Sequence, residues 1–232
     1  MDPASEHRVS SFVRPFLISV VATLVFTGIV LACAGRVTVW QAWVYAAISL
    51  SLNVGQRIVL FGHPELARER AKPPADARAE DKALLAIGLA LTLAMLVTAG
   101  LQFRFADGPS LSLAWLVVGV VLQLGGGGLF LRALRENAFF SAAVRIQTDR
   151  QHAVCTTGPY RFVRHPGNLG MIVGAIGIPL VLQSTWCLVP AALFVASLVV
   201  RTHLEDALLT RELDGYRDYR ERTRYRLVPG IW

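Results

Sequence analysis

Long runs without a charged residue dominate the pattern of hydrophobic and polar positions in this chain. Residues 15–35, 37–56, 83–103 and 108–131 are four such runs, and each approaches the roughly 20 apolar residues that a helix needs to cross a bilayer. A longer run, residues 166–200, is interrupted by Pro179 and by Gln183 and Ser184, which suits a hairpin of two short spans that turns near Gln183. The pattern predicts an all-α, polytopic membrane bundle of about six spans, the last two forming a hairpin.

The candidate chemistry is concentrated in one part of the chain. Residues 1–134 are expected to form a four-span membrane scaffold, whose inner loop, residues 61–82, is charged and rich in proline and therefore irregular with a short helix. Residues 135–232 are expected to form a second region that contains a polar segment, the membrane hairpin and a polar tail. Leucines recur in that tail at near-helical spacing between charged residues. This spacing predicts an amphipathic helix over residues 202–222 with a break at Gly215.

The distribution of charge predicts how the spans are oriented. With 54% hydrophobic residues and a mean hydropathy of +0.49, the chain is too apolar for an ordinary soluble domain. The net charge of the chain is +7. In the six-span arrangement only Arg36 and Arg104 lie on one side, whereas the other Lys and Arg residues lie on the opposite side. The basic side is normally cytoplasmic, so both termini are expected in the cytoplasm, with a bacterial inner membrane as the expected location. Membrane lipids are expected partners, and nucleic acid is not, because no recognition motif accompanies the basic residues.

Cysteine and glycine indicate packing rather than chemistry. The three cysteines, Cys33, Cys155 and Cys187, are scattered along the chain, so neither a disulfide framework nor a metal site is expected. Four consecutive glycines, residues 125–128, lie inside the fourth span without the Lys-Ser/Thr of a phosphate-binding loop, which favours close helix packing. Gln123 precedes them and is expected to form a hydrogen bond between helices.

A dense polar segment at the edge of a span is the strongest candidate for a functional site. Residues 158–170 contain two prolines and three glycines, so the backbone there is shaped rather than helical throughout. This loop is expected to project Tyr160, Arg161, Arg164 and His165 together. Arginine and histidine are costly near hydrocarbon and usually mark function there. His165 suits either general acid–base catalysis or an interfacial hydrogen bond, since histidine titrates near neutral pH.

A second polar pair lies where the chain leaves the last apolar run. Arg201 and Glu205 are four residues apart, hence on one face of a helix. The spacing suits a structural salt bridge and, equally, a binding surface in which Glu205 accepts hydrogen bonds from a cationic or hydroxylated ligand and Arg201 holds an anionic group. We interpret this pair and residues 158–170 as two halves of one site.

The C-terminal region carries its motifs in a distinctive order. Residues 158–170 read Gly-Pro-Tyr-Arg-Phe-Val-Arg-His-Pro-Gly-Asn-Leu-Gly, residues 201–209 read Arg-Thr-His-Leu-Glu-Asp-Ala-Leu-Leu, and Tyr216, Tyr219 and Pro229 follow. This order resembles the isoprenylcysteine carboxyl methyltransferases, whose pattern is Arg-His-Pro-x-Tyr-x-Gly, a membrane hairpin, Glu-Glu-x-x-Leu and a Tyr-x-x-Tyr-like tail. The resemblance covers roughly residues 137–232 and is specific in order and spacing.

The resemblance implies an activity and a methyl donor. It implies an integral membrane enzyme that moves a methyl group from S-adenosylmethionine to a lipophilic acceptor, with a carboxylate as one class of acceptor. The donor would bind on the cytoplasmic side, beneath a lipid-facing tunnel. Arg201 and Glu205 are the implied catalytic residues, with Arg201 facing a lipophilic small-molecule or lipid-modified substrate. The implied contacts to the donor are Arg145, His152, Ala153, Val154, Cys155, Tyr160, His165, Pro166, Gly167, Asn168 and Glu205.

Two positions depart from the family pattern. Asn168 stands where the family has a tyrosine, which removes a ring that could pack on the cofactor, and Asp206 replaces the second glutamate. Nothing in the chain itself indicates a prenylated protein as the acceptor. A carboxylate acceptor would already be ionised at neutral pH, so that catalysis would be mainly alignment and desolvation.

Three other functions remain open at this point. A phospholipid or small-lipid N-methyltransferase would share the same access from the lipid. Membrane sterol-type reductases that use NADPH carry a similar Arg-His-Pro turn, but they place Asn-Tyr after His-Pro and an acid after the final glycine, where this chain has Gly167, Asn168 and Met171. A non-catalytic membrane scaffold with a diverged site is the third.

Overall fold

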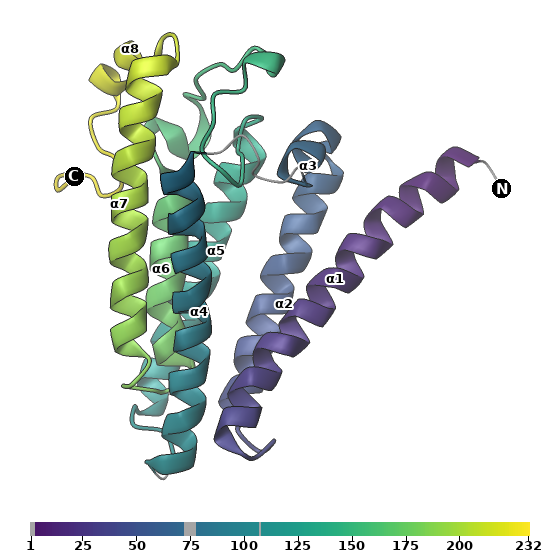
Figure 1. The fold of residues 1–232 in the computed structure, drawn as a ribbon, viewed down its shortest axis with the longest axis vertical. Coiled ribbons are helices and arrows are strands. Elements are labelled where there is room, and N and C mark those ends of the chain that lie inside the picture. Colours follow the sequence, from purple (N-terminus) through teal and green to yellow (C-terminus); the bar gives the residue numbers. More distant parts are fainter. Residues whose placement is uncertain (1–2, 72–77, 107) are drawn as a thin grey trace.

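The computed structural model describes residues 3–71, 78–106 and 108–232. Every regular element in these residues is helical, and the long helices run side by side along the longest axis of the molecule (Figure 1). The elements are α1 (Pro3–Ala34), α2 (Trp40–Phe61), α3 (Pro64–Ala71), α4 (Ala79–Phe105), α5 (Leu113–Glu136), η1 (Thr148–Arg150), η2 (Gly158–Arg161), α6 (Pro166–Val181), α7 (Leu188–Glu212) and α8 (Tyr216–Arg222).

The helix lengths confirm the prediction of a polytopic membrane bundle. In the described part of the chain, five helices are long and apolar enough to cross a membrane, namely α1 from Arg14 onward, α2, α4, α5 and α7. The sixth expected span, α6, has 16 residues, which is about 24 Å at 1.5 Å per residue and shorter than a hydrocarbon core of about 30 Å. It packs between α5 and α7, so its short length is compensated by protein on its flanks.

The turn of the predicted hairpin is near Gln183, as expected. Gln183 has a φ of 48°, a left-handed conformation that its surroundings stabilise. Its side-chain amide donates to the Leu111 carbonyl at 2.7 Å and its Oε1 accepts from Gln41 at 2.9 Å. The adjacent Ser184 donates to Gln102 Oε1 at 2.9 Å. Polar groups buried in a bundle need such partners, and here they tie the hairpin to α2 and α4.

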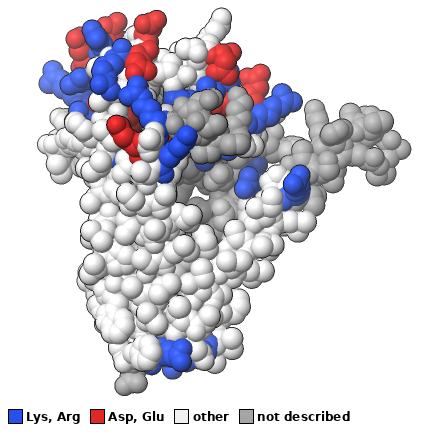
Figure 2. All heavy atoms as spheres, viewed as in Figure 1, with Lys and Arg blue, Asp and Glu red and all other residues white. Residues whose placement is uncertain are grey.

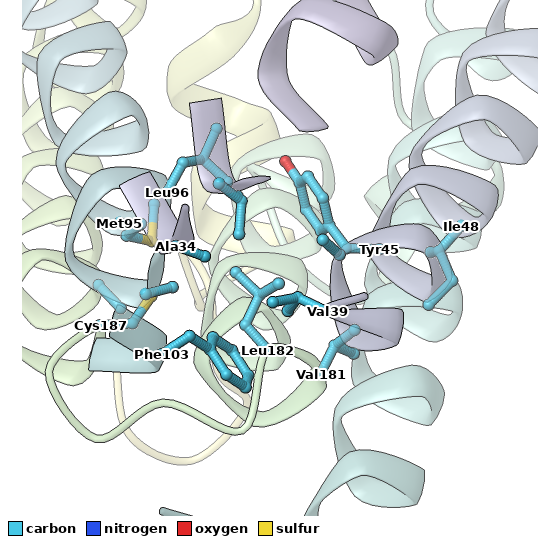
Figure 3. Close-up of a cluster of buried hydrophobic side chains, with 14 residues drawn as sticks. Ala34, Val39, Tyr45, Ile48, Met95, Leu96, Phe103, Val181, Leu182 and Cys187 are labelled. Atoms are coloured by element: carbon cyan, nitrogen blue, oxygen red, sulfur yellow. The ribbon is translucent and has the colours of Figure 1, made fainter. Parts of the chain in front are cut away.

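The largest hydrophobic core lies at the hairpin end of the bundle (Figure 3). Residues of α1, α2, α4 and the α6–α7 turn meet there, and the labelled side chains converge on a common interior. The fully or almost fully buried members include Val30, Ala42, Met95, Leu96, Ala99, Val181, Leu182 and Cys187. The N-terminal helices and the hairpin are therefore one packed unit.

Glycines set the separation of α5 and α6. A Cβ at Gly126 would meet the backbone of Gly170 and Gly174 at 2.5 Å, and a Cβ at Gly177 would meet the Gly119 carbonyl at 2.7 Å. Such contacts are closer than side chains allow, so the two helices approach as only glycines permit. The expected packing role of residues 125–128 is thus confirmed for Gly126, which faces α6 directly.

The cytoplasmic-side elements differ in detail from the prediction. The short helix expected in residues 61–82 is α3, and residues 72–77 lie outside the described residues. The expected tail helix is not separate, because α7 runs without interruption through Arg201 and Glu205 to Glu212. Gly215, with a φ of 78°, lies between α7 and α8 and directly precedes α8, so the predicted break at this residue is confirmed.

Charged side chains gather at one end of the molecule (Figure 2). This end holds α8, the N-terminal end of α6 and the C-terminal end of α7 (Figure 1). At the opposite end of the bundle, Arg36 follows α1 and Arg104 lies in the last turn of α4. Arg36 donates there to the Phe103 carbonyl at 2.9 Å. The two ends of the bundle are therefore strongly unequal in charge, as the sequence predicts.

Candidate active site

A cavity of about 310 Å³ lies at the charged end of the bundle. Its walls come from the ends of α5, α6 and α7, from α8, and from the irregular segment of residues 137–155. Aromatic side chains form much of the lining, and carboxylate, amide and guanidinium groups interrupt it. The aromatic residues are Phe130, Phe139, Phe140, Tyr160, Tyr216 and Tyr219.

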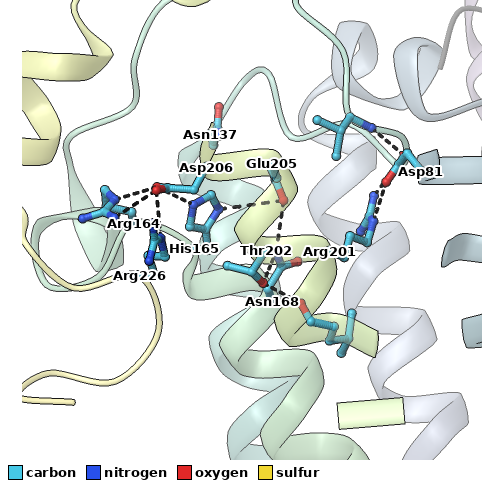
Figure 4. Close-up of polar contacts among 12 residues, drawn as sticks. Asp81, Asn137, Arg164, His165, Asn168, Arg201, Thr202, Glu205, Asp206 and Arg226 are labelled. Carbon is cyan, nitrogen blue, oxygen red and sulfur yellow. Dashed lines mark hydrogen bonds and ion pairs between the residues drawn. The ribbon is translucent and has the colours of Figure 1, made fainter. Parts of the chain in front are cut away.

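Beside this cavity lies a buried ionic cluster centred on Asp206, which is 1% exposed (Figure 4). Arg164 Nε donates to Asp206 Oδ1 at 2.7 Å, and Arg226 Nε donates to Oδ2 at 2.9 Å. Tyr216 donates its hydroxyl to Oδ1 at 2.9 Å, and His165 Nε2 lies 3.2 Å from the same oxygen. We call these five residues the Asp206 cluster. Each carboxylate oxygen is shared by several donors, so the buried charge is compensated.

The Asp206 cluster also holds Arg164 charged and Tyr216 neutral. Burial alone would lower the pKa of Arg164, but the hydrogen bonds and charge of Asp206 outweigh it and raise that pKa. Burial and the negative charge of Asp206 both raise the pKa of the Tyr216 hydroxyl, so the phenol stays neutral and donates. The cluster thus locks the start of α6 to α7 and α8.

The C-terminal segment completes this arrangement by folding back. Arg164 N donates to the Tyr225 carbonyl and His165 N to the Arg226 carbonyl, each at 2.9 Å. Trp232 stacks its ring against the Arg226 guanidinium, at 4.9 Å from ring centroid to Cζ. The last residues of the chain therefore brace the segment that carries His165.

Glu205 precedes Asp206 on α7 but belongs to the cavity wall. Its Oε2 accepts a hydrogen bond from Asn168 Nδ2 at 3.0 Å and lies 3.8 Å from His165 Nδ1. Asn168 also donates to Thr202 Oγ1 at 3.0 Å. The Glu205 side chain remains 26% exposed. Asn168 stands where the family pattern has a tyrosine. Its hydrogen bond orients the Glu205 carboxylate in the cavity wall.

Arg201 does not pair with Glu205, although their spacing permits it. Its Nε donates to Asp81 Oδ1 at 2.8 Å, and its Nη2 donates to the Ala142 carbonyl at 2.9 Å. Asp81 Oδ2 in turn accepts from Val144 N at 2.9 Å. Asp81, in the first turn of α4, thus connects Arg201 to the wall segment of residues 137–155 (Figure 4).

The comparisons with known proteins concern this same region. Residues 128–211 match the model of the isoprenylcysteine carboxyl methyltransferase family. This part of the chain is therefore similar to that family. Two rice proteins, from Oryza sativa subsp. indica and subsp. japonica, each named "Probable protein-S-isoprenylcysteine O-methyltransferase", are 34% identical over 99 residues, which is 40% of this chain and 49% of each relative. The chain therefore spans about half the length of the curated relatives it matches.

Most residues that the methyltransferase resemblance places at the donor surround one cavity. Pro166 is the exception, because it is buried at the start of α6 and is not part of the lining. Arg161 is exposed and also lies off the cavity, so the expectation that the loop projects it together with Tyr160, Arg164 and His165 is wrong for Arg161. The predicted site residues that do line the cavity are Arg145, His152, Ala153, Val154, Cys155, Tyr160, His165, Gly167, Asn168, Arg201 and Glu205.

Arg145 and His152 hold the outer wall together. Arg145 donates to Glu69 Oε1 at 2.8 Å and to Asp149 at 3.1 Å. His152 stacks on the Phe139 ring with centroids 4.6 Å apart. Burial, reinforced by the nearby guanidinium charges of Arg145 and Arg150, lowers the pKa of His152, so the imidazole is neutral near pH 7.

Tyr160 forms the inner wall. Asn137 Nδ2 donates to its hydroxyl oxygen at 3.4 Å, and Tyr219 donates to its carbonyl at 2.7 Å. Burial raises the pKa of Tyr160, and it likewise raises the pKa of the neighbouring Cys155 thiol. Both groups are therefore neutral at physiological pH, so neither offers a charged acceptor to a ligand.

Sequence reasoning missed the residues that support the site from other elements. Asp81 comes from the first turn of α4. Asn137, Phe139 and Phe140 come from the segment after α5, where no motif marks them. Tyr216 and Tyr219 stand in a quoted motif, but only the folded chain shows that they face the cavity. One feature of the sequence could have pointed to Asp81. It is an acid at the start of an apolar helix, and charged residues next to membrane spans often have a function.

Proposed function

We propose that this protein is an integral membrane methyltransferase that takes its methyl group from S-adenosylmethionine and passes it to a lipophilic acceptor, with a carboxylate as the acceptor group. The observation that carries the proposal is the single cavity that brings Glu205, Arg201 and the His165 segment together at the charged end of the bundle. The match of residues 128–211 to a methyltransferase family supports it.

The cavity suits a donor of this kind in size and chemistry. Its volume, about 310 Å³, lies at the lower end of the roughly 300–1,000 Å³ typical of small-molecule sites. Aromatic faces attract cations, and Glu205 offers a carboxylate to an amino or hydroxyl group. When bound, S-adenosylmethionine supplies a methyl group activated by a positively charged sulfur.

Arg201 is the group that would hold the acceptor. Its contacts with described residues occupy Nε and Nη2, which leaves Nη1 to donate to an acceptor carboxylate. An arginine fork binds carboxylates with defined geometry. Asp81 prevents the side chain from swinging away, so the acceptor oxygen can be held in line.

The remaining residues contribute alignment rather than proton transfer. A carboxylate acceptor is ionised at neutral pH, so no general base is needed, and His165 is free to serve as part of the Asp206 cluster. Glu205 and Asn168 position the donor, and the aromatic wall excludes water. Correct orientation of two reactants can lower a barrier by about 7–11 kcal/mol, which is the main effect available to such a site.

The charged end of the bundle is proposed to face the cytoplasm. Apart from Arg36 and Arg104, the Lys and Arg residues lie on that side, and the positive-inside rule places it in the cytoplasm with both termini. A bacterial inner membrane is the proposed location. Fusion of a cytoplasmic reporter and of a periplasmic reporter to the C-terminus tests this, since only the cytoplasmic one should be active.

Calorimetric titration of the purified full chain in nanodiscs is the test of the activity. Saturable binding of S-adenosylmethionine, with no binding of NADPH, is the expected result. Arg161→Ala is the control and should bind S-adenosylmethionine as the unaltered protein does. Arg161 belongs to the same polar segment as His165 but is exposed and does not line the cavity. Binding of NADPH alone would indicate the reductase, and binding of neither would indicate a non-catalytic scaffold. Methylation of a lipid amine rather than a carboxylate would show that the acceptor group is an amine.

A further inference from the structure

A second hollow lies within the bundle, away from the charged end. It has a volume of about 250 Å³ and is lined by α2, α5 and α6. We call it the membrane groove. Three helical stripes line it, each spaced at about one turn. They are Tyr45, Ser49, Leu52, Asn53 and Gln56 on α2, Gln123, Gly127, Phe130 and Leu131 on α5, and Gly170, Met171, Gly174 and Ile178 on α6.

The membrane groove and the candidate donor cavity share two lining residues. Phe130 and Met171 line both hollows, so they are neighbouring parts of one interior. A molecule whose reactive end lies in the cavity can therefore extend its tail past these two side chains into the groove. Gly127 keeps the groove open, because a Cβ there would collide with the Leu52 side chain of α2.

The membrane groove contains a polar atom that lacks a partner. Gln123 is 4% exposed, and its Oε1 accepts no hydrogen bond from any residue that the structure describes. The expectation that Gln123 bonds to a neighbouring helix is therefore wrong for this oxygen. A buried acceptor left unsatisfied is costly, and more so at a depth where the surroundings are hydrocarbon. Native structures rarely tolerate such a group without a reason.

The stripe of α2 opposite Gln123 is polar as well. Ser49, Asn53 and Gln56 succeed one another along the face that borders the groove, although most of α2 is apolar. Asn53 directs its amide toward Thr23 of α1 at 3.4 Å, so it contributes to the helix contact. A groove for a purely hydrocarbon tail would not need polar groups on two facing helices.

We propose that the membrane groove binds the chain of a membrane amphiphile that carries a hydrogen-bond donor, such as a hydroxyl or a secondary amide, which Gln123 Oε1 accepts. Gln123 lies two turns of α5 from Phe130, or about 10 Å along the helix. The donor is therefore about that far along the chain from the group that lies in the cavity. This inference names the acceptor class for the proposed methyl transfer and rests on that function only in calling the amphiphile an acceptor.

The test is a competition experiment on the full chain in nanodiscs. A fluorescent fatty acid is displaced by stearic acid and by a series of hydroxystearic acids whose hydroxyl is moved stepwise along the chain. Hydroxyls at one or two neighbouring positions should bind roughly three- to ten-fold better than stearic acid, as one net hydrogen bond provides. Gln123→Met keeps the length of the side chain but removes the acceptor, so it should abolish this preference and leave the affinity for stearic acid intact.

Leu124→Met is the matched control, because Leu124 is exposed on the outer face of the same turn, and it should keep the preference. Equal binding of all the fatty acids to the unaltered protein, or a preference that survives Gln123→Met, would overturn the proposal. A change in melting temperature without a change in preference would make Gln123 a structural residue and overturn it too. Since no step requires S-adenosylmethionine, a protein that fails to bind the donor can still show the preference, and the two proposals fail separately.

Discussion

Glu205 and Asp206 are consecutive acids on α7, yet they lie in different environments. Asp206 receives hydrogen bonds from Arg164, Tyr216 and Arg226 and is closed off from solvent. Glu205 accepts from Asn168, and its side chain is a quarter exposed toward the cavity. A saturated carboxylate contributes to the fold, whereas one with free acceptor capacity can bind a ligand. The paired acids therefore differ in role: Asp206 is a buried structural acid, and Glu205 is the acid that we propose binds the donor.

The largest effect should follow from removal of the structural acid. Asp206→Asn leaves the guanidinium of Arg164 buried without its counter-charge, and breaking a buried pair costs about 3–5 kcal/mol. We expect a large fall in the melting temperature of the detergent-purified protein, measured by differential scanning fluorimetry. Glu205→Gln is the adjacent control, and its melting temperature should be close to that of the unaltered protein. Equal destabilisation by both changes would remove the distinction between the two acids.

The binding acid should show the opposite behaviour. Glu205→Gln keeps the hydrogen bond from Asn168 but removes the charge, and a hydrogen bond to a charged group contributes about 1.5–3 kcal/mol. We therefore expect the affinity for S-adenosylmethionine to fall roughly ten- to one hundred-fold, as measured by calorimetry, while the protein stays folded. Unchanged affinity in this variant would place the donor elsewhere in the cavity.

The contrast between the two acids could not be predicted from the sequence. The charge-free runs suffice to predict the long helices, and the position of Gln183 suffices to predict the hairpin turn, because both are local patterns in the sequence. The partners of Asp206 come from the segment just before α6, from α8 and from the last residues of the chain, which no periodicity brings together. The pairing of Arg201 with Asp81 could not be predicted either, because the two residues lie far apart in the chain. The local spacing suited a salt bridge with Glu205 and, equally, a binding surface.

The predicted domain boundary at residue 134 also shows that long-range contacts are not visible in the sequence. The division at residue 134 describes where the motifs are, but the cavity also takes Arg70 of α3, Leu85 of α4 and Phe130 of α5 as walls. Asp81, which precedes that boundary in the chain, accepts a hydrogen bond from Arg201. We therefore regard residues 135–232 as the proposed source of the chemistry and the preceding helices as part of its support.

An intermediate effect should come from the anchor of Arg201. Asp81→Asn keeps a hydrogen-bond acceptor but removes the charge that holds the guanidinium, so Arg201 becomes less well positioned. We expect the binding of stearic acid to weaken roughly five-fold, or about 1 kcal/mol, in the fatty-acid competition experiment, with the affinity for S-adenosylmethionine unchanged. Glu80→Gln is the control, since Glu80 lies on the same turn but is exposed and is not part of the donor cavity. Loss of donor binding in Asp81→Asn would show that Arg201 acts on the donor side.

The smallest effect should come from the tyrosines that close the structural side of the cavity. Tyr219 donates to the Tyr160 carbonyl at 2.7 Å, and Tyr219→Phe removes a hydrogen bond that contributes about 1 kcal/mol. Tyr225→Phe is the control, because Tyr225 is partly exposed and the described contacts involve its backbone rather than its hydroxyl. A modest fall in melting temperature is expected for the first variant and none for the second.

The pH dependence of the same variants separates burial from hydrogen bonding. Burial raises the pKa of Tyr219, as it does for Tyr160 and Tyr216, so the folded protein holds these protons more tightly than the unfolded chain. Their contribution to stability is complete below the unfolded pKa of about 10 and is lost as the pH rises above it. The melting temperature should therefore fall above about pH 10, and less steeply for Tyr219→Phe than for Tyr225→Phe. Parallel curves for the two variants would mean that Tyr219 is not held neutral by burial.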